Sequence, residues 1–290
     1  MTGALLSFSA SAVAIRALAK QLTIFEILSI RSGVGLLVLL VLIAARADLR
    51  RSLMFQRMGL HLARNSIHFC GTYSWTLAVT LLPFATVFAL EFTMPMWVAL
   101  LAVPLLGERL TRSRIGSVVL GFLGVLVIVR PGVASFQPAA LLVLGAAFAF
   151  AISLIQTKIL TNTINTFTII FWMNCMQLPM ALAGSDPLFI ARLDAGAILP
   201  ALTLGAVGLT SHYCLTNAFR AGDATVVVPM DFLRIPLIAL VGWLFYNEGL
   251  DLFVFAGAAL IIGGVLWNLR AESRRPPTGL GPEKATVADA

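Results

Sequence analysis

Residues 87–110 read VFALEFTMPMWVALLAVPLLGERL, and residues 227–250 read VVPMDFLRIPLIALVGWLFYNEGL. The two stretches belong to a longer ungapped match between the halves of the chain, with a constant offset of 140 residues. An acidic residue inside an apolar run recurs at the same place in both copies, as Glu91 and Asp231. Two related halves in a membrane chain are typical of transporters whose binding site lies between the halves.

The composition indicates a chain embedded in a lipid bilayer. Hydrophobic residues make up 59% of the 290 residues and charged residues 11%, and the mean hydropathy is +0.96. A soluble domain carries about 25% charged residues, so the repeated apolar runs leave no room for one. The formal charge of +7 is compatible with nucleic-acid binding, but the arginines occupy short loops between apolar runs, which is the pattern of membrane orientation. We therefore expect a lipid bilayer and no nucleic acid as partner.

The apolar runs predict an all-α integral membrane protein with ten transmembrane helices, because one span needs about 20 mostly apolar residues. Clusters of Pro and Gly mark several of the breaks between the runs. The chain divides into a first five-span repeat at 1–132, a second, inverted five-span repeat at 133–270 and a disordered cytoplasmic tail at 271–290. The predicted spans are 2–19, 22–45, 60–81, 83–106, 114–130, 138–158, 164–184, 196–219, 223–246 and 251–269.

The loop charges predict the orientation of these spans. Fourteen Lys and Arg residues fall on one side, four fall on the other, and two lie within spans. The richer side is expected to be cytoplasmic, together with both termini. Because five spans are an odd number, the second repeat starts on the opposite side of the membrane from the first. Such an inverted pair alternates between outward-open and inward-open states around a central cavity; a duplicated scaffold without a transport role is the alternative.

The cysteines and histidines do not predict a metal or catalytic site. Cys70, Cys175 and Cys214 lie in apolar segments, with no CxxC pattern, and we expect them to pack in the core. His68 and His212 each precede a cysteine by two residues, a spacing that puts the pair on different helix faces. No HExxH or GxSxG pattern is present, so we expect no catalytic residue, no metal and no cofactor.

Ionisable groups inside the predicted spans are the candidate site, because each costs on the order of 2.5–3.5 kcal/mol to insert and usually faces the protein interior or water. An acid suits the ammonium of an amino acid, and an arginine suits its carboxylate. Glu91 has no partner on its own helix, so it is either protonated or paired across the cavity. Asp231 and Arg234 share a helix face and alternatively pair with each other. The six groups are Arg31, His68, Glu91, His212, Asp231 and Arg234, of which Arg31, His68, His212 and Arg234 are candidate partners of Glu91.

Aromatic residues and prolines complete the predicted binding site. A flat ring in the substrate would pack on an aromatic wall. Pro95 and Pro236 interrupt equivalent helices and free the carbonyls of Glu91 and Phe232, where an ammonium could bind; a plain packing kink is the alternative. Pro229 adds a second break. The candidates for the wall are Tyr73, Trp75, Trp97, Trp172, Tyr213 and Trp243, although Trp243 and Trp267 lie near span ends, where interfacial aromatic belts form.

Two glutamates and a set of glycines are given structural roles. We expect Glu108 and Glu248, at the ends of equivalent spans, to tie loop backbone to the helix that follows. Small residues allow helices to approach closely, so we expect packing and no chemistry from the glycines. The glycines concerned are Gly33, Gly35, Gly116, Gly121, Gly124, Gly205, Gly208, Gly257, Gly263 and Gly264.

Gly-Glu-Arg-Leu at 107–110, Asn-Glu-Gly-Leu at 247–250 and the Glu91-x-x-x-Pro95 pattern, set in two five-span halves, resemble the EamA branch of the drug/metabolite transporter superfamily. The resemblance covers about residues 1–270 and implies a central cavity built from the first four spans of each half, with 114–130 and 251–269 outside it. Within the branch, the chain is most similar to exporters of aromatic amino acids from bacterial inner membranes. The implied function is export of a small molecule such as Phe, Trp or Tyr; a multidrug or cationic-compound exporter is the alternative. No feature of the sequence specifies an oligomeric state.

Overall fold

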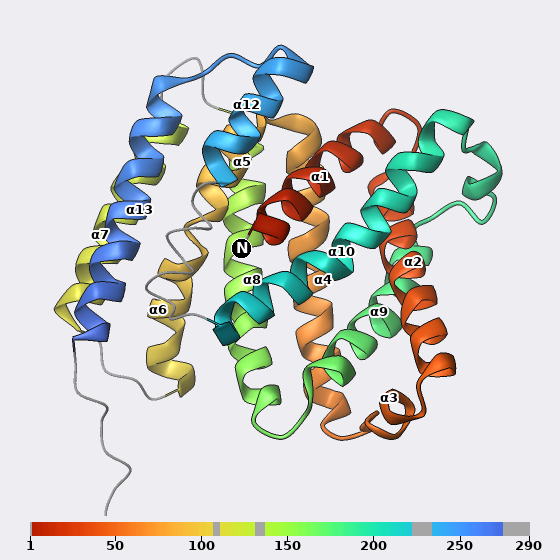
Figure 1. Cartoon of the computed structure of the whole chain (residues 1–290). Helices are drawn as coiled ribbons and strands as arrows, with labels where there is room; N and C mark the ends of the chain where they lie inside the picture. The colour runs from red at the N-terminus through yellow and green to blue at the C-terminus, as the bar shows by residue number, and fades with distance from the viewer. Residues whose placement is uncertain (1, 107–110, 131–136, 222–233, 275–290) are drawn as a thin grey trace, which may run out of the picture.

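In a computed structural model, the described residues, 2–106, 111–130, 137–221 and 234–274, contain helices and their connections only (Figure 1). This confirms the all-helical prediction. The elements are α1 (Thr2–Leu18), α2 (Ile24–Ala45), α3 (Ala47–Arg51), α4 (Met58–Leu81), α5 (Phe84–Glu91), α6 (Met94–Leu106), α7 (Arg112–Val129), α8 (Ala140–Thr161), α9 (Thr166–Leu182), the 3-10 helix η1 (Phe189–Arg192), α10 (Ala195–Ala221), α12 (Arg234–Tyr246) and α13 (Leu252–Ser273).

Several helices begin where a polar side chain caps the first turn. Thr23 and Glu26 form a capping box at the start of α2, in which the Thr23 N–H donates to Glu26 Oε2 at 2.8 Å. Asn165 Oδ1 accepts the N–H of Thr168 at 2.8 Å at the start of α9, and Thr111 caps α7. Because these caps satisfy backbone donors that would otherwise lack a partner, they fix the points at which the chain enters these helices.

The segment predicted as one span at 83–106 is two helices. Helix α5 ends at Glu91 and α6 begins at Met94, and Pro95 lies in the first turn of α6. Thr93 Oγ1 donates to the Leu90 carbonyl at 2.8 Å within the break. The break therefore lies beside the acidic residue, as the proline pattern predicted. Pro236 lies in the first turn of the described part of α12, whereas Pro229 and Asp231 fall outside the described residues, as does Glu108.

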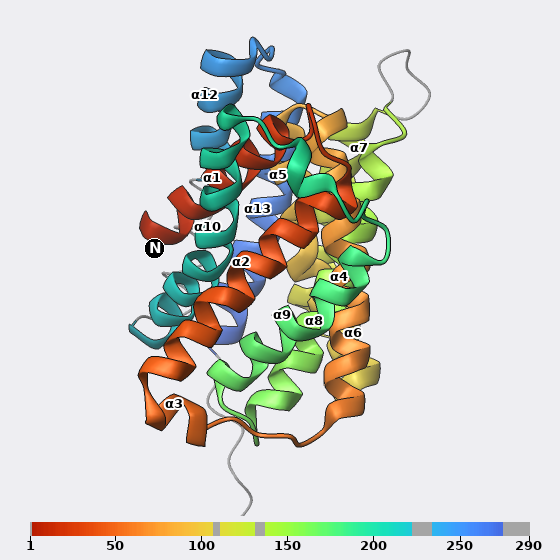
Figure 2. The same cartoon turned by 90° about the vertical axis from the view of Figure 1, so that its right-hand side faces the viewer.

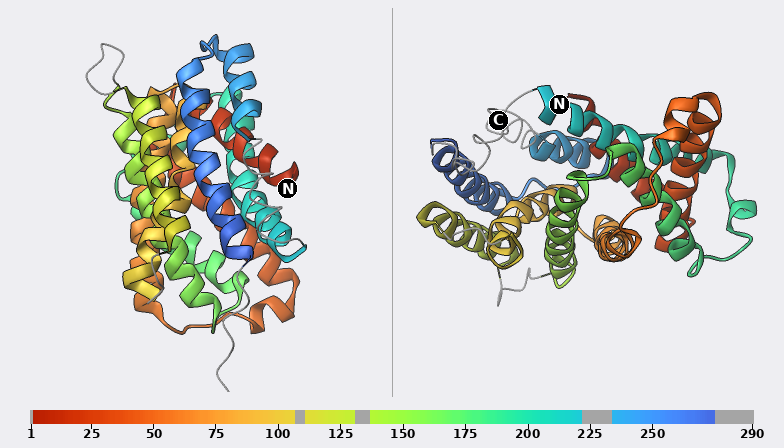
Figure 3. Two further views of the ribbon diagram at one scale, coloured as in Figure 1. Left: turned by 90° about the vertical axis from the view of Figure 1, so that its left-hand side faces the viewer. Right: turned by 90° about the horizontal axis from the view of Figure 1, so that it is seen from below.

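The helices form a bundle in which distant segments of the chain pack in pairs. Helices α4 and α8 lie side by side at the centre, α1 packs along α10, and α2 packs along α9 (Figures 1 and 2). Helices α7 and α13 form a pair at one edge of the bundle, and α2 and α9 lie at the opposite edge (Figure 3). This arrangement puts α7 and α13 outside the centre, as the family resemblance implied for 114–130 and 251–269.

Glycines allow α7 and α13 to approach closely. A Cβ added at Gly124 would lie 2.6 Å from the Gly257 carbonyl oxygen, and one at Gly257 would lie 2.6 Å from the Gly124 carbonyl oxygen. At Gly116 an added Cβ would lie 2.2 Å from the Trp267 ring. These contacts agree with the packing role expected for the three glycines, because any side chain would force the helices apart.

The surface of the bundle is apolar in a way that suits lipid. Helical stretches long and apolar enough to cross a bilayer are Ile24–Ala45, Phe84–Leu101, Arg112–Val129, Ala140–Thr161 and Leu252–Ala271, and shorter apolar ones are Leu5–Leu18, Thr166–Leu182, Ala195–Ser211 and Arg234–Tyr246. Exposed leucines and phenylalanines, such as Leu37, Phe122 and Leu199, lie on the outside of these helices. The number of spans and the inverted relation of the halves stay predictions.

Helix α4 is absent from both groups because its polar residues lower its hydropathy, and many of these polar side chains are buried inside the bundle. We call the end of the bundle that carries the turns 19–23, 82–83 and 247–251 the upper end, after its position in Figure 1. The buried core lies toward this end, where the fully buried side chains of Ile15, Leu18, Phe84 and Phe88 meet Ile238 and Ile261. The core therefore joins helices from both halves of the chain.

Candidate transport site

Glu91, Trp75 and Arg234 come together where α4, α5 and α12 meet. Glu91 Oε2 accepts a hydrogen bond from Trp75 Nε1 at 2.9 Å. Glu91 Oε1 lies 3.7 Å from Arg234 Nη1, which is a loose ion pair. The Glu91 side chain is 17% exposed and that of Arg234 is 5% exposed. Of the candidate partners of Glu91, the structure identifies Arg234, on a helix from the other half of the chain.

Three phenylalanines surround the guanidinium of Arg234. Its Cζ lies 4.5 Å from the ring centre of Phe8, 5.2 Å from that of Phe88 and 5.0 Å from that of Phe92. Such cation–π contacts partly replace the hydration of a buried cation. The Trp75 ring meets Phe88 edge-on, with ring centres 5.8 Å apart. We call Glu91, Arg234, Trp75 and these three phenylalanines the central site.

The phenylalanines of the central site were missed from the sequence. Phe88 and Phe92 lie three residues before and one residue after Glu91, and Phe8 comes from the far end of the repeat. A helix places residues three and four apart on one face, so the spacing of Phe88 to Glu91 was a usable signal. Phe8 had no such signal, because only the packing of α1 across the bundle brings it to Arg234.

His68 lies on the same face of α4 as Trp75, about 10 Å away along the helix axis toward the start of the helix. Its Nδ1 lies 2.9 Å from Gln177 Nε2 and 3.2 Å from Thr72 Oγ1. The ring also packs against Phe150, with ring centres 5.4 Å apart. His68 therefore joins α4 to α8 and α9, in a polar cluster of its own below the central site.

A second polar cluster on α4 was also missed. From the sequence, Arg64 counts with the inner loop charges, but it lies in α4 and its side chain is buried in the bundle. It donates to Asn65 Oδ1 at 2.7 Å and to Thr157 Oγ1 at 3.1 Å. His61 is fully buried, and neither of its ring nitrogens has a hydrogen-bond partner among the described residues. The spacing of His61, Arg64 and His68 predicts one polar helix face, which was the available signal.

The other predicted wall residues do not gather at Glu91. Tyr73 packs against Phe25, with ring centres 4.9 Å apart. Trp172 donates to the Met54 carbonyl at 3.0 Å near the lower end of the bundle, and Trp97 packs edge-on against Phe148. Tyr213 is 69% exposed, and Trp243 and Trp267 are half exposed, as belt residues would be. The side chain of His212 lies outside the described residues.

Above the central site, Arg16 and Glu248 form an ion pair at the upper end. Glu248 Oε2 also accepts the N–H of Phe84, the first residue of α5, at 2.9 Å. Glu248 thus ties backbone, as expected, but the backbone of α5 rather than that of the following helix α13.

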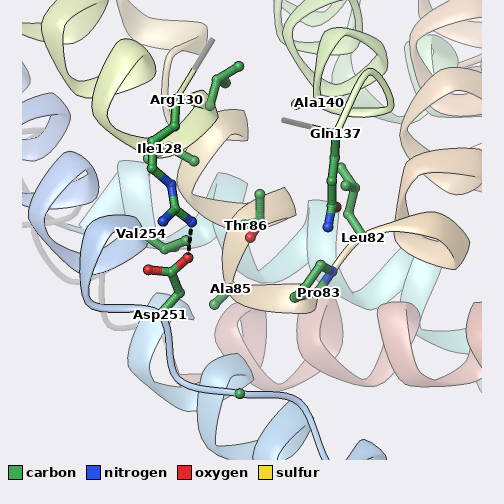
Figure 4. Close-up of a pocket in the computed structure, with 12 residues that line it drawn as sticks. Leu82, Pro83, Ala85, Thr86, Ile128, Arg130, Gln137, Ala140, Asp251 and Val254 are labelled. Carbon is green, nitrogen blue, oxygen red and sulfur yellow. Dashed lines mark hydrogen bonds and ion pairs between the residues drawn. The ribbon is translucent and has the colours of Figure 1, made fainter. Parts of the chain in front are cut away.

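Beside this pair lies the pocket shown in Figure 4, with a volume of about 80 Å³. Arg130 and Asp251 form an ion pair across one wall, and Thr86 and Gln137 line the other side. A pocket of this size has room for a few water molecules. The pocket lies at the upper end, and none of the central-site residues lines it.

The described residues contain no group of three or more His, Cys, Asp or Glu side chains that could hold a metal ion. The cysteines at 70, 175 and 214 are free thiols, and Cys70 is exposed on the helix surface. The chemistry available at the central site is therefore one carboxylate, one guanidinium and aromatic rings. These groups suit noncovalent contacts with a charged molecule that carries a ring.

The sequence matches the EamA-like transporter family over residues 1–130 and again over residues 137–270. The chain belongs to this family, and it is a multi-pass membrane transporter rather than an enzyme.

Relatives with named substrates cover most of the chain. A riboflavin transporter of Brucella anthropi is 31% identical over 78% of this chain and 81% of its own length. An S-adenosylmethionine uptake transporter of Rickettsia felis is 27% identical over 93% of this chain and 91% of its own length. A pseudopaline exporter, CntI, of Pseudomonas aeruginosa is 29% identical over 88% of this chain and 89% of its own length.

Proposed function

We propose that the chain exports a small zwitterion with a flat ring across the bacterial inner membrane, by alternating access, and that aromatic amino acids are its substrates. The observation that carries the proposal is the loose pair of Glu91 and Arg234 within a set of aromatic rings. An ammonium binds a carboxylate, a carboxylate binds a guanidinium, and a ring packs on rings. The central site offers all three, on helices from both halves of the chain.

The geometry supports a specific binding step. The 3.7 Å separation of Glu91 Oε1 and Arg234 Nη1 is longer than the 2.7–2.9 Å typical of a charge-assisted hydrogen bond. A zwitterion entering between them gives its ammonium to Glu91 and its carboxylate to Arg234, so an internal ion pair is exchanged for two pairs with the substrate. Because neither charge is left unpaired when the substrate leaves, the empty carrier is also stable enough to reorient.

The pairing of Glu91 argues against the multidrug alternative. A site for permanent cations favours acidic groups whose charge is not already balanced, whereas Glu91 faces a guanidinium. Riboflavin is the second candidate substrate, because a relative named as a riboflavin transporter is 31% identical to this chain. Riboflavin also carries a flat ring system but has no ammonium group, so Glu91 would contribute less to its binding.

Counterflow into liposomes that contain the purified protein tests the proposal. The vesicles are loaded with unlabelled phenylalanine, tryptophan, riboflavin, S-adenosylmethionine or a quaternary ammonium ion, and uptake of the labelled form of each is measured. We expect uptake of phenylalanine and tryptophan, which the quaternary cation does not inhibit. Uptake of riboflavin alone would assign the second candidate, and uptake of the cation alone would overturn both.

A further inference from the structure

Arg31 differs from the other arginines inside the bundle. It lies in α2, about 10 Å along the helix axis from Ile24, and is only partly exposed. Arg16, Arg130 and Arg234 each pair with a carboxylate, and Arg64 has neutral hydrogen-bond acceptors. Arg31 has neither an ion pair nor a hydrogen bond with any residue in the described parts of the chain.

Glycines on two helices create a small cavity around Arg31. A Cβ added at Gly208 of α10 would lie 3.5 Å from Arg31 Nε, so the side chain lies flat across this glycine. Gly205 receives the side chain of Val34 and brings α10 against α2, and Gly35 receives the amide of Asn174 from α9. The cavity between α2, α9 and α10 has a volume of about 10 Å³ and is partly open.

A partly buried charge in this position favours a counter-ion. Leaving a guanidinium without a partner inside a protein costs several kcal/mol, and intramembrane arginines usually face a partner or a path for an ion. The cavity holds little more than one water-sized group, which excludes a whole amino acid or nucleotide. It suits the end of a larger molecule, with the rest of that molecule lying outside the opening.

The geometry points to an oxyanion site at Arg31, separate from the central site, that binds the carboxylate or phosphate group of a ligand at the mouth of the cavity between α2, α9 and α10. The planar guanidinium matches either group with two parallel hydrogen bonds. The neighbouring Asn174 is neutral, and its Nδ2 already donates to the Ile170 carbonyl at 2.9 Å. The positive charge of the site therefore comes from Arg31. The group comes either from a free solute or from an anionic lipid headgroup.

Binding measurements on the full-length purified chain test this site without relying on transport. Calorimetric titrations in detergent use 3-phenylpropionate and inorganic phosphate, with phenethylamine as a ligand that has no anionic group. A further comparison measures thermal unfolding in nanodiscs of phosphatidylcholine with and without phosphatidylglycerol. The variants are Arg31→Gln and, as a control, Arg46→Gln, which removes the same charge at an exposed position after the same helix.

We expect Arg31→Gln to weaken binding of 3-phenylpropionate or phosphate at least about tenfold, while Arg46→Gln leaves it unchanged. If instead only stabilisation by phosphatidylglycerol is lost in Arg31→Gln, the oxyanion is that of a lipid. If Arg31→Gln does not fold, Gly208→Val takes its place. This variant fills the cavity and keeps the charge of Arg31, and we expect it to show the same loss of binding. The proposal is overturned if Arg31→Gln binds every anionic probe with the affinity of the wild-type protein, or if the wild-type protein binds none of them.

Discussion

Arg16 of α1 and Glu248, which follows α12, join the two halves of the chain at the upper end of the bundle. Arg16 Nη2 also donates to the carbonyls of Val79 at 2.7 Å and Leu82 at 2.6 Å, at the end of α4. Its guanidinium lies 3.6 Å above the ring of Phe84. The pair thus links the last turn of α4, the first turn of α5 and the turn before α13 in one network. We expect this network to hold the upper end shut in the state described.

Removing either partner of this pair is expected to destabilise the protein. The side chains are 16% and 14% exposed, so Arg16→Ala or Glu248→Ala leaves a mostly buried charge without its partner. Such changes cost roughly 3–5 kcal/mol in buried pairs, and we expect the lower part of this range here. Thermal unfolding of both single variants and the double variant measures the effect. A double variant as destabilised as the sum of the two single variants would show that the pair contributes nothing.

Glu91→Gln is expected to impair transport and leave folding near normal. The amide keeps an oxygen that can accept the Trp75 N–H, but it has lost the charge that binds an ammonium. We expect phenylalanine counterflow to fall by at least about tenfold, which corresponds to about 1.4 kcal/mol. Thermal unfolding close to that of the wild-type protein separates this effect from misfolding. Counterflow at the wild-type rate would make Glu91 a structural residue. Asp231→Asn gives the matching test for the second copy of the acid.

Trp75→Phe isolates the hydrogen bond to Glu91. The change keeps an aromatic ring against Phe88 and removes the Nε1 donor that lies 2.9 Å from Glu91 Oε2. A hydrogen bond to a charged group contributes about 1.5–3 kcal/mol, so we expect weaker phenylalanine binding by roughly tenfold or more. Trp243→Phe, at a half-exposed position, is the control and is expected to bind as the wild-type protein does. Equal affinity in both variants contradicts the role given to Trp75.

The α7–α13 pair predicts a contrast between two glycines on one helix. Gly257→Ala puts a Cβ 2.6 Å from the Gly124 carbonyl oxygen, whereas a Cβ at Gly263 meets nothing within 4 Å. Overpacking of this kind costs about 1–3 kcal/mol, so Gly257→Ala is expected to lower the unfolding temperature. Gly263→Ala is expected to be neutral or stabilising by up to about 1 kcal/mol, since Ala favours helix. Equal unfolding temperatures for the two variants would contradict the close packing of α7 and α13 at Gly257.

Local sequence signals predicted the helices well, because each apolar run is long and its ends carry caps or breakers. The Glu91–Pro95 pattern located the break between α5 and α6, and Glu91 and Arg234 were both candidates before their contact was visible. A proline or an ionisable residue within one apolar run was enough for these features.

The partners across the bundle could not be predicted in the same way. Phe8 reaches Arg234 only because α1 crosses the bundle, and Trp172 turns toward Met54 although its residue type suited the aromatic wall. One sequence specifies which faces of a helix are buried but not which helix covers them. The short helices α3 and η1 were also missed, since five or fewer residues carry no periodic signal.

Competition by truncated substrates tests the central claim, that a zwitterion binds between Glu91 and Arg234, most directly. Counterflow of labelled phenylalanine is measured with unlabelled phenylalanine, phenethylamine or 3-phenylpropionate as competitor, in wild-type protein and in Glu91→Gln. We predict that phenylalanine competes far better than either analogue in the wild-type protein, and that the advantage of the ammonium group disappears in Glu91→Gln. Equal competition by phenylalanine and 3-phenylpropionate in the wild-type protein would contradict the account, because Glu91 would then have no ammonium to bind.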